Sequence, residues 1–340
     1  MAENPRSYPL LIALMKRSRT KWRWILVFIF IFLFVLLILF TFLDDSSNEL
    51  SHWGFWRSYL DGPILIIYIL LIYPFIWRLW SRAVETLHGL LPVNNSGLNQ
   101  VSKENPLPAR RWEWVSIIVG VLFWLALWQP WAESWRSGIV WLSTYDLLTQ
   151  ILLFGLLAWL IFVSIASNRY IYRISRNNLS VDLFETSVLT PIARSSLGFS
   201  LAFIGGISLS LVFQSQEDLL MWNNIVVWAI LVCFVLLLFF LSMWSIHKAM
   251  AKVKNGELEW TQRHLKESSL EFKRKVLEGK LVDVSAISST VNFWMNYERR
   301  IKETSDWPFN PSILRRLAAS IVAPVAVFLI KVLPGLGVGT

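Results

Sequence analysis

Asp146 and Gln150 are the two polar residues whose type and spacing point most directly to a site. They are four residues apart at the start of a long apolar run, so in a helix they share one face, one turn apart. Either side chain could line the outer entrance for a cation. In the alternative interpretation, Asp146 simply faces water at a membrane interface beside Trp141.

A second polar group lies inside an apolar run, between residues 195 and 213. Small residues let helix backbones approach closely, and serine hydroxyls can bond across such a contact or line a narrow wet path. Three of the serines are separated by four and eight residues and therefore share one helix face. The run predicts either a pore-lining face or a helix-packing seam, with the candidate residues Ser196, Ser200, Gly205, Gly206 and Ser208.

The residue types needed for catalysis or metal binding are scattered. His52, His88, His247 and His264 are spread over three regions between or after the apolar runs and make no metal-ligand spacing, and Cys233 is the single cysteine. The sequence contains no phosphate-binding loop, no nucleophile motif and no HExxH motif. No ionisable residue lies at mid-depth in an apolar run, where a proton relay would need one. We therefore expect no enzymatic activity, no cofactor and no metal site.

The elements that position these residues are transmembrane helices. Hydrophobic residues make up 55% of the 340 residues and charged residues 16%, whereas charged residues make up about 25% of a typical soluble domain. Six apolar runs are long enough to cross a bilayer as helices, and pairs of Trp residues mark their edges. We predict an all-α, polytopic helix bundle with spans at about 24–43, 63–80, 114–131, 147–166, 195–213 and 222–246.

The distribution of charge orients these spans. Basic residues close to spans are retained in the cytoplasm, and of the 32 Lys and Arg residues the connections on one side hold only Arg57 and Arg136. The basic N-terminal segment, residues 1–23, is therefore predicted to be cytoplasmic, in the inner membrane of a cell. The net charge of +9 is spread over several loops, as a topology signal requires, so we expect no nucleic-acid partner.

The region over residues 247–310 follows the six-span domain of residues 24–246. Apolar residues recur at helical spacing in both of its halves, which predicts a cytoplasmic helical hairpin. Its first helix would continue the sixth span inward, unless Asn255-Gly256 breaks it. Trp260 and Trp294 cannot be assumed to be interfacial anchors, so we expect them in the core of the hairpin or in a partner contact.

The last segment, residues 311–340, leaves two possibilities. Asn310 and Pro311 make a good start for a helix, which then carries a charge-free run that Pro324 interrupts and Lys331 follows. That run is short for a span, although its continuation to Val338 would be long enough. The sequence predicts either a seventh span or a re-entrant or interfacial segment.

Two short stretches carry a family resemblance. One runs from Phe184-Glu185 to Arg194-Ser195-Ser196-Leu197-Gly198, and the other leads from Trp307-Pro308-Phe309 into Leu314-Arg315-Arg316-Leu317. They resemble segments of uncharacterised bacterial polytopic membrane proteins. The resemblance implies a multi-span membrane protein, names no activity and carries no functional residue across.

Two functions from different classes fit these features. In the first, the spans form a homo-oligomer around a conduit, and the cytoplasmic hairpin gates this channel or pore-forming effector in response to a signal ligand. In the second, the protein is a non-conducting scaffold in the lipid bilayer whose hairpin docks a soluble cytoplasmic protein. A secondary transporter ranks third, because the sequence shows neither paired broken spans nor a charge at mid-membrane.

Overall fold

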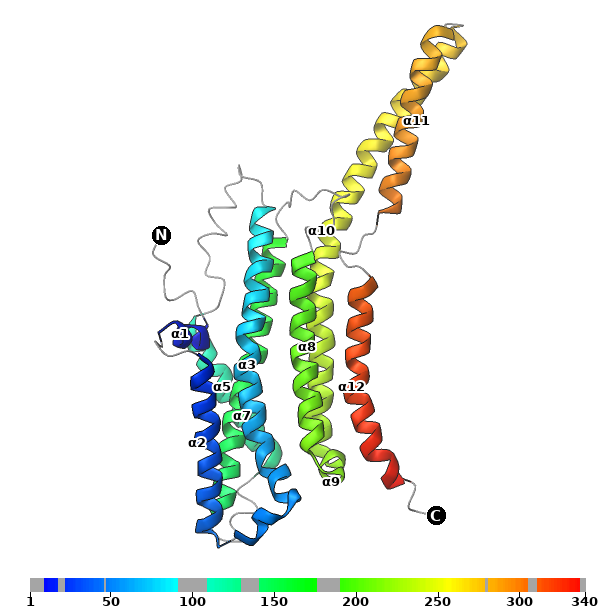
Figure 1. The fold of residues 1–340 in the computed structure, drawn as a ribbon. Coiled ribbons are helices and arrows are strands. Elements are labelled where there is room, and N and C mark those ends of the chain that lie inside the picture. The colour runs from blue at the N-terminus through cyan, green and yellow to red at the C-terminus, as the bar shows by residue number, and fades with distance from the viewer. Residues whose placement is uncertain are drawn as a thin grey trace.

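The computed structural model describes residues 9–17, 22–45, 47–90, 109–129, 141–175, 190–278, 281–304 and 311–336. Every regular element in these ranges is a helix (Figure 1). Six of these helices are long and apolar enough to cross a membrane, which confirms the prediction of an all-α chain with six candidate spans. They are α2 (Trp22–Leu43), α3 (Trp53–Gly89), α5 (Arg110–Trp128), α7 (Trp141–Ser175), α8 (Thr190–Phe213) and α10 (Trp222–Leu277).

Five further elements complete the described chain. A short helix at the N-terminal end and a one-turn helix flank α2, and another short helix joins α8 to α10. Two longer helices follow α10 (Figure 1). The five are α1 (Leu10–Arg17), η2 (Ser47–Ser51), α9 (Gln216–Leu220), α11 (Leu281–Glu303) and α12 (Pro311–Leu336).

Most of the spanning helices are longer than the apolar runs that predict them. Helix α3 has 37 residues and α7 has 35, because hydropathy locates the part of a helix that can face hydrocarbon and not the point where its backbone hydrogen bonds end. Helix α10 has 56 residues, or about 84 Å at 1.5 Å per residue. It is continuous through Asn255-Gly256, so the suspected break is absent.

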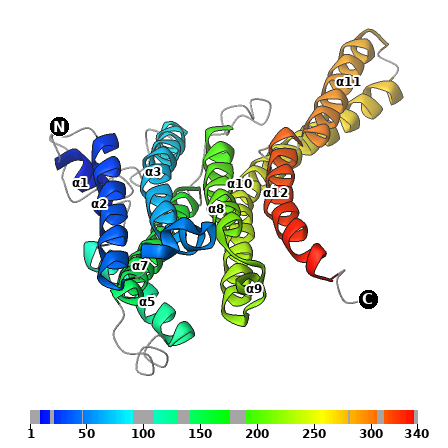
Figure 2. The same ribbon diagram turned by 60° about the horizontal axis from the view of Figure 1, so that its bottom comes forward.

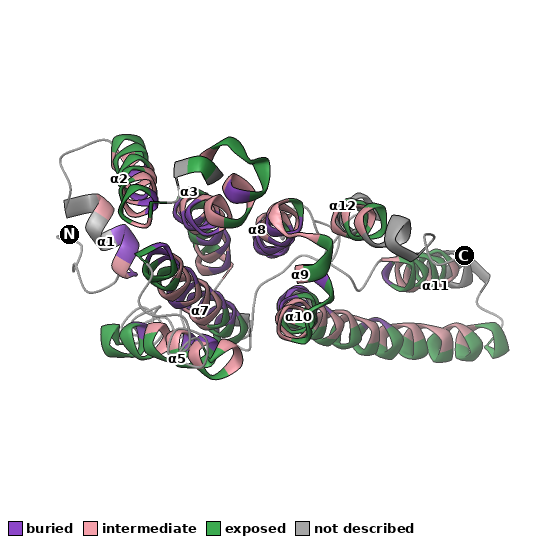
Figure 3. Cartoon of the chain, turned by 90° about the horizontal axis from the view of Figure 1, so that it is seen from below, coloured by how far each residue is buried: buried purple, intermediate pink, exposed green. Residues whose placement is uncertain are grey.

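Helix α8 lies at the centre of the bundle. In its most apolar window 61% of the residues are buried, against 22% in α2 and 17% in α5. It packs against α3, α10 and α12, whereas α5 packs mainly against α7 (Figure 3). Helices α2 and α5 therefore expose rows of large apolar side chains, Phe28, Phe32 and Ile118 among them, as helices that face lipid do.

Helix α12 lies along the outside of α8 (Figures 1 and 2). Near its C-terminal end, the Nζ of Lys331 donates hydrogen bonds to the carbonyl oxygens of Leu211, Val212 and Gln214, at 2.5, 2.8 and 2.8 Å. These carbonyls belong to the last turn of α8 and the residue beyond it, where helix carbonyls lack partners within the helix. Helix α12 therefore runs alongside α8 as far as the α9 end of the bundle.

The C-terminal half of α10 and α11 form an arm that projects beyond the bundle, at the end opposite α9 (Figure 1). The rings of Trp260 and Trp294 meet edge to face with their centroids 5.2 Å apart. His264 packs against both rings, and the hydroxyl of Tyr297 donates to the carboxylate of Glu257 at 3.0 Å. Aromatic packing thus holds α11 along α10.

Candidate functional site

A cavity of about 390 Å³ lies between α3, α7, α8 and α10, toward the end of the bundle that carries α9. Along α7 its lining runs from Asp146 to Leu160, which corresponds to about 21 Å of helix. This length is about two thirds of the thickness of a typical hydrocarbon layer, which is about 30 Å.

Three carboxylates line the polar end of this cavity. Asp61 comes from α3, Asp146 from α7 and Asp218 from α9. Asp218 is held by a capping box, in which its backbone N–H donates to the Oγ of Ser215 at 3.1 Å and its carboxylate accepts from the backbone N–H of Ser215 at 3.2 Å. The side chain of Asn224 donates to the carbonyl of Asp218 at 2.6 Å. The first turn of α10 thus ties α9 to the cavity wall.

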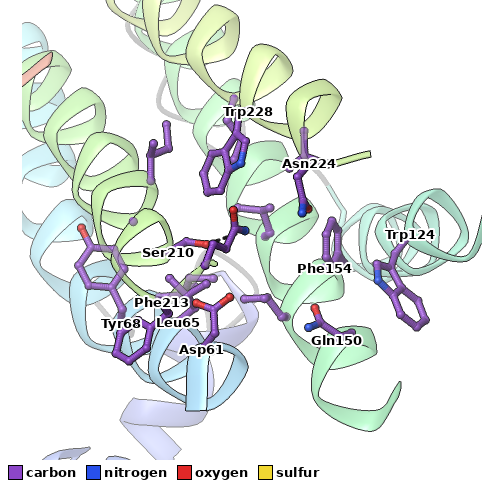
Figure 4. A pocket seen from close by; sticks show the side chains of 18 of the residues that line it. Asp61, Leu65, Tyr68, Trp124, Gln150, Phe154, Ser210, Phe213, Asn224 and Trp228 are labelled. Carbon is purple, nitrogen blue, oxygen red and sulfur yellow. Dashed lines mark hydrogen bonds between the residues drawn. The ribbon is translucent and has the colours of Figure 1, made fainter. Parts of the chain in front are cut away.

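The opposite end of the cavity is apolar. Its deeper lining includes Leu65, Ile69, Leu157, Leu160 and Phe203. The charged residues of the lining lie toward α9, and Figure 4 shows Asp61, Gln150, Ser210 and Asn224 around that part of the space. Tyr68 lies among the deeper residues, and its hydroxyl donates to the carbonyl of Ala202. The cavity is therefore amphipathic along its length, with a charged mouth and an apolar base.

Three polar atoms that face this region have no hydrogen-bond partner among the described residues. They are the Oδ1 of Asp61, the Oε1 of Gln214 and the Nε1 of Trp228, and each atom is shielded from bulk solvent. All three residues line the cavity. Unpaired polar groups are costly in a protein interior, and these residues leave two acceptors and one donor unpaired in the cavity wall.

The positive charges nearby are directed at the end of α8. The Nε of Arg57 donates to the carbonyl of Phe213 at 2.6 Å, and its Nη2 donates to the carbonyl of Gln214. Lys331 binds the same helix end. The partial negative charge of a helix C-terminus attracts cations, and among the described residues neither cation lies within 4.0 Å of a cavity carboxylate. Arg57 and Lys331 thus bind the end of α8 and not a carboxylate of the cavity.

Asp146 and Gln150, the predicted entrance residues, both line this cavity. The Nε2 of Gln150 lies 3.4 Å from the Oδ1 of Asp146, as their spacing of one helical turn requires. The contributions of Asp61 and Asp218 were missed, because both residues lie just outside apolar runs and resemble ordinary loop acids. The sequence did contain a signal for them, because acidic residues lie near the ends of three spans on the same predicted side of the membrane.

The small residues of α8 mostly face other helices. Ser196 is buried with its Oγ 3.5 Å from the carbonyl of Phe239 in α10, and Ser200 is fully buried. The backbone of Gly205 lies against Tyr68 of α3, and Ser208 donates to the carbonyl of Ile204 at 2.8 Å within α8. Gly206 is the one residue of the predicted set that lines the cavity. The cavity face of α8 instead carries Phe203, Ile207 and Ser210.

Two other features lie away from the cavity. Trp260 and Trp294 meet each other in the arm. Glu113, near the start of α5, is only 4% exposed, and its Oε2 accepts from the backbone N–H of Leu10 and from the Nε1 of Trp159, both at 2.9 Å. This buried carboxylate ties α1 to α7, and it was missed because it lies beside a predicted span rather than inside one.

No known protein indicates what this cavity does. The chain matches no protein-family model, no curated protein and no solved structure. Among the described residues, no cluster of three or more His, Cys, Asp or Glu side chains could hold a metal ion. Function has to be inferred from the cavity, the arm and the helix that joins them.

Proposed function

We propose that this protein is a multi-span protein of the cell inner membrane that conducts a cation, with the cavity as its outer entrance. The observation that carries the proposal is the convergence of Asp61, Asp146 and Asp218 from three elements on one cavity. Rings of acidic side chains are the usual means of attracting cations to a pore. Arg57 does not cancel this effect, because it is bound to the end of α8.

The orientation of the protein follows from its basic residues. Arg78 and Arg82 lie in the C-terminal half of α3, and Arg169 and Arg173 lie in that of α7. By the positive-inside rule, these residues support a cytoplasmic position for this end of the bundle. The N-terminus and the arm are then cytoplasmic, and the mouth of the cavity faces outward. Helix α12, with 26 residues, would cross the membrane as a seventh span about 39 Å long and bring the C-terminus to the outer face.

The apolar base of the cavity would act as the gate. Constrictions lined by apolar side chains block ions by excluding water, and Leu157, Leu160 and Phe203 occupy this position. Helix α10 lines the cavity through Asn224, Trp228 and Leu231 and continues without a break into the arm. A signal ligand or partner that moves the arm would therefore move one wall of the cavity. In this proposal the conduit lies within a single chain, so a homo-oligomer would place several such conduits side by side.

The test is cation flux into liposomes that contain the purified full-length protein. We expect Asp61→Asn together with Asp146→Asn to reduce cation flux at least severalfold, since removing the charge lowers the local cation concentration. Glu217→Gln is the matched control, because Glu217 is an exposed acid of the same region that does not line the cavity. Equal flux in all three proteins would refute the assignment of the entrance.

The arm favours a second candidate, a scaffold that docks a soluble cytoplasmic protein. Phe293 is 58% exposed, Leu270 57% and Met295 50%, although such side chains outside a bilayer are usually covered. Under this proposal Phe293→Ser with Met295→Ser would abolish co-purification of the partner, while wild-type protein would show no flux under any ligand or voltage. Flux that persists after deletion of residues 255–303 would show that conduction does not require the arm.

A further inference from the structure

An apolar groove lies directly beside the charged cavity. It has a volume of about 460 Å³ and is formed by α5, α7 and α10. Its lining is hydrophobic apart from Ser116, and it includes Val119, Phe123, Ile161 and Ile230. Several of these side chains are exposed in the isolated chain, so within a bilayer the groove is covered by hydrocarbon.

The groove and the cavity share one wall. Phe154 and Leu157 of α7 and Val227 and Leu231 of α10 line both spaces. Along α5, residues 112–123 contribute to the groove, and Trp124, the next residue, contributes to the cavity. Figure 4 shows Phe154 and Trp124 on the side of the cavity away from Tyr68. The two spaces therefore follow one another along α5 and are separated by a single layer of side chains.

We propose that the groove and the cavity together form a binding site for an amine amphiphile dissolved in the bilayer. Its apolar chain lies in the groove between α5 and α10, and its protonated amine reaches past Phe154 to Asp61 and Asp146. Because the groove opens sideways to lipid, the molecule enters from the membrane and not from the aqueous mouth. Occupation of the site does not require that the protein conducts.

Charge and hydrogen bonding select the head group. The cavity lining carries three carboxylates and one guanidinium, and the guanidinium is bound to carbonyl oxygens at the end of α8. A protonated amine is a pure donor, which suits the carboxylates of Asp61, Asp146 and Asp218 in the cavity lining. A sulfate or phosphate head would place negative charge among these carboxylates, and an uncharged head would gain no ion pair.

The apolar lining favours a ligand with an alkyl chain over a simple cation. The base of the cavity and the groove offer mainly hydrocarbon contacts to a ligand, which a small hydrated cation cannot use. An alkyl chain fills this surface, and each CH₂ group it buries adds to the binding affinity. The neighbouring arrangement of a charged mouth and an apolar groove therefore fits a molecule that has both parts.

Photolabelling tests the proposal on the full-length protein in phosphatidylcholine nanodiscs. The probe is hexadecylamine with a diazirine in its chain, and the matched probes are the corresponding alcohol and sulfate. We expect the amine to label the segments 154–161 and 227–231 about tenfold more strongly than either matched probe, which corresponds to about 1.4 kcal/mol. Equal labelling by the three probes, or labelling confined to other segments, would overturn the proposal.

Two pairs of variants separate the head from the chain. Asp61→Asn with Asp146→Asn should reduce amine labelling about tenfold and leave alcohol labelling unchanged, whereas Glu217→Gln should change neither. Val119→Trp should fill the groove and block labelling by every probe. Ile118→Trp is its matched control, because Val119 and Ile118 are 55% and 56% exposed on the same helix, and Ile118 lies outside the groove lining.

Competition with propylamine completes the test. A large excess of this short amine should not displace the long-chain probe, because it cannot occupy the groove. Competition at equal concentrations would show that the cavity is a plain cation site and would refute the role of the groove. Absence of ion flux together with the expected labelling would overturn the proposed conduction and leave the amphiphile site standing.

Discussion

The contact between Gly205 of α8 and Tyr68 of α3 gives the sharpest test of how the cavity is built. A Cβ atom at position 205 would lie 2.4 Å from the hydroxyl oxygen of Tyr68, far inside van der Waals contact. That hydroxyl donates a hydrogen bond to the carbonyl of Ala202 at 2.7 Å. Gly205→Ala therefore forces the Tyr68 ring away from α8 and breaks this bond.

The expected cost has two parts. Loss of one hydrogen bond costs about 0.5–1.5 kcal/mol, and overpacking of a closely packed contact costs about 1–3 kcal/mol. Gly205→Ala should thus lower the free energy of unfolding by about 1.5–4.5 kcal/mol in total. At Gly206 a Cβ atom would lie 3.4 Å from the Tyr68 ring, an ordinary contact. Gly206→Ala, one residue away, is therefore the matched control and should be nearly neutral.

Tyr68→Phe makes the prediction specific to the hydroxyl. Alone it should cost about 1 kcal/mol for the hydrogen bond. In the Gly205→Ala background it removes the clashing atom, and the next ring atom lies 3.3 Å from the new Cβ. The double variant should therefore be more stable than Gly205→Ala alone, a coupling that independent sites do not show.

The assay is unfolding of the purified protein by SDS in mixed micelles, with the wild type and the four variants measured side by side. Gly205→Ala that behaves like Gly206→Ala would show that α3 and α8 are not in this register. Strict additivity of Gly205→Ala and Tyr68→Phe would show that the hydroxyl is not the obstructing atom. The first result would also contradict the packing of α3 against α8 along the cavity.

Three further predictions concern other parts of the chain. Lys331→Met removes the three hydrogen bonds to the end of α8 and should loosen α12, seen as faster proteolysis of the C-terminal helix, whereas Lys331→Arg should retain protection. Glu113→Ala leaves the buried N–H of Trp159 without its acceptor and should cost about 1–3 kcal/mol of unfolding free energy, against a smaller loss in Glu113→Gln; equal losses would contradict the role of the carboxylate as an acceptor. Gly256→Ala should stabilise α10, because a Cβ there meets open space and Ala is favoured over Gly in helices by about 1 kcal/mol. Gly256→Pro should break the helix, so that deletion of the arm no longer changes any measured flux.

The sequence predicts the spanning helices well and the contacts between them poorly. A run such as 24–43 must be a helix in a bilayer, because its backbone groups can be satisfied in no other way. Nothing comparable indicates that Asp61 approaches Asp146, since their distance depends on how α3 and α7 pack. The polar residues of α8 illustrate the same limit: their spacing identifies a shared face but not whether that face meets water or another helix.

The end of the chain shows a different limit. The apolar run before Lys331 is too short to identify a span from hydropathy, and α12 is placed by a contact instead. Lys331 finds partners because α8 ends at Phe213 and leaves carbonyl oxygens exposed. A lysine at the end of an apolar segment is expected to point toward polar groups, but the sequence does not say which groups these are.

The end of α8 also explains how a negative cavity can exist beside two cations. Carboxylates and basic side chains that lie close together normally pair, and a paired site would attract no further charge. Here the carbonyl oxygens at the end of α8 attract Arg57 and Lys331, and the partial negative charge of the helix end favours them there. Helix α9 begins immediately beyond and places Asp218 on the cavity wall. One helix terminus therefore binds the cations, positions a carboxylate and leaves the charge of the cavity available to a ligand.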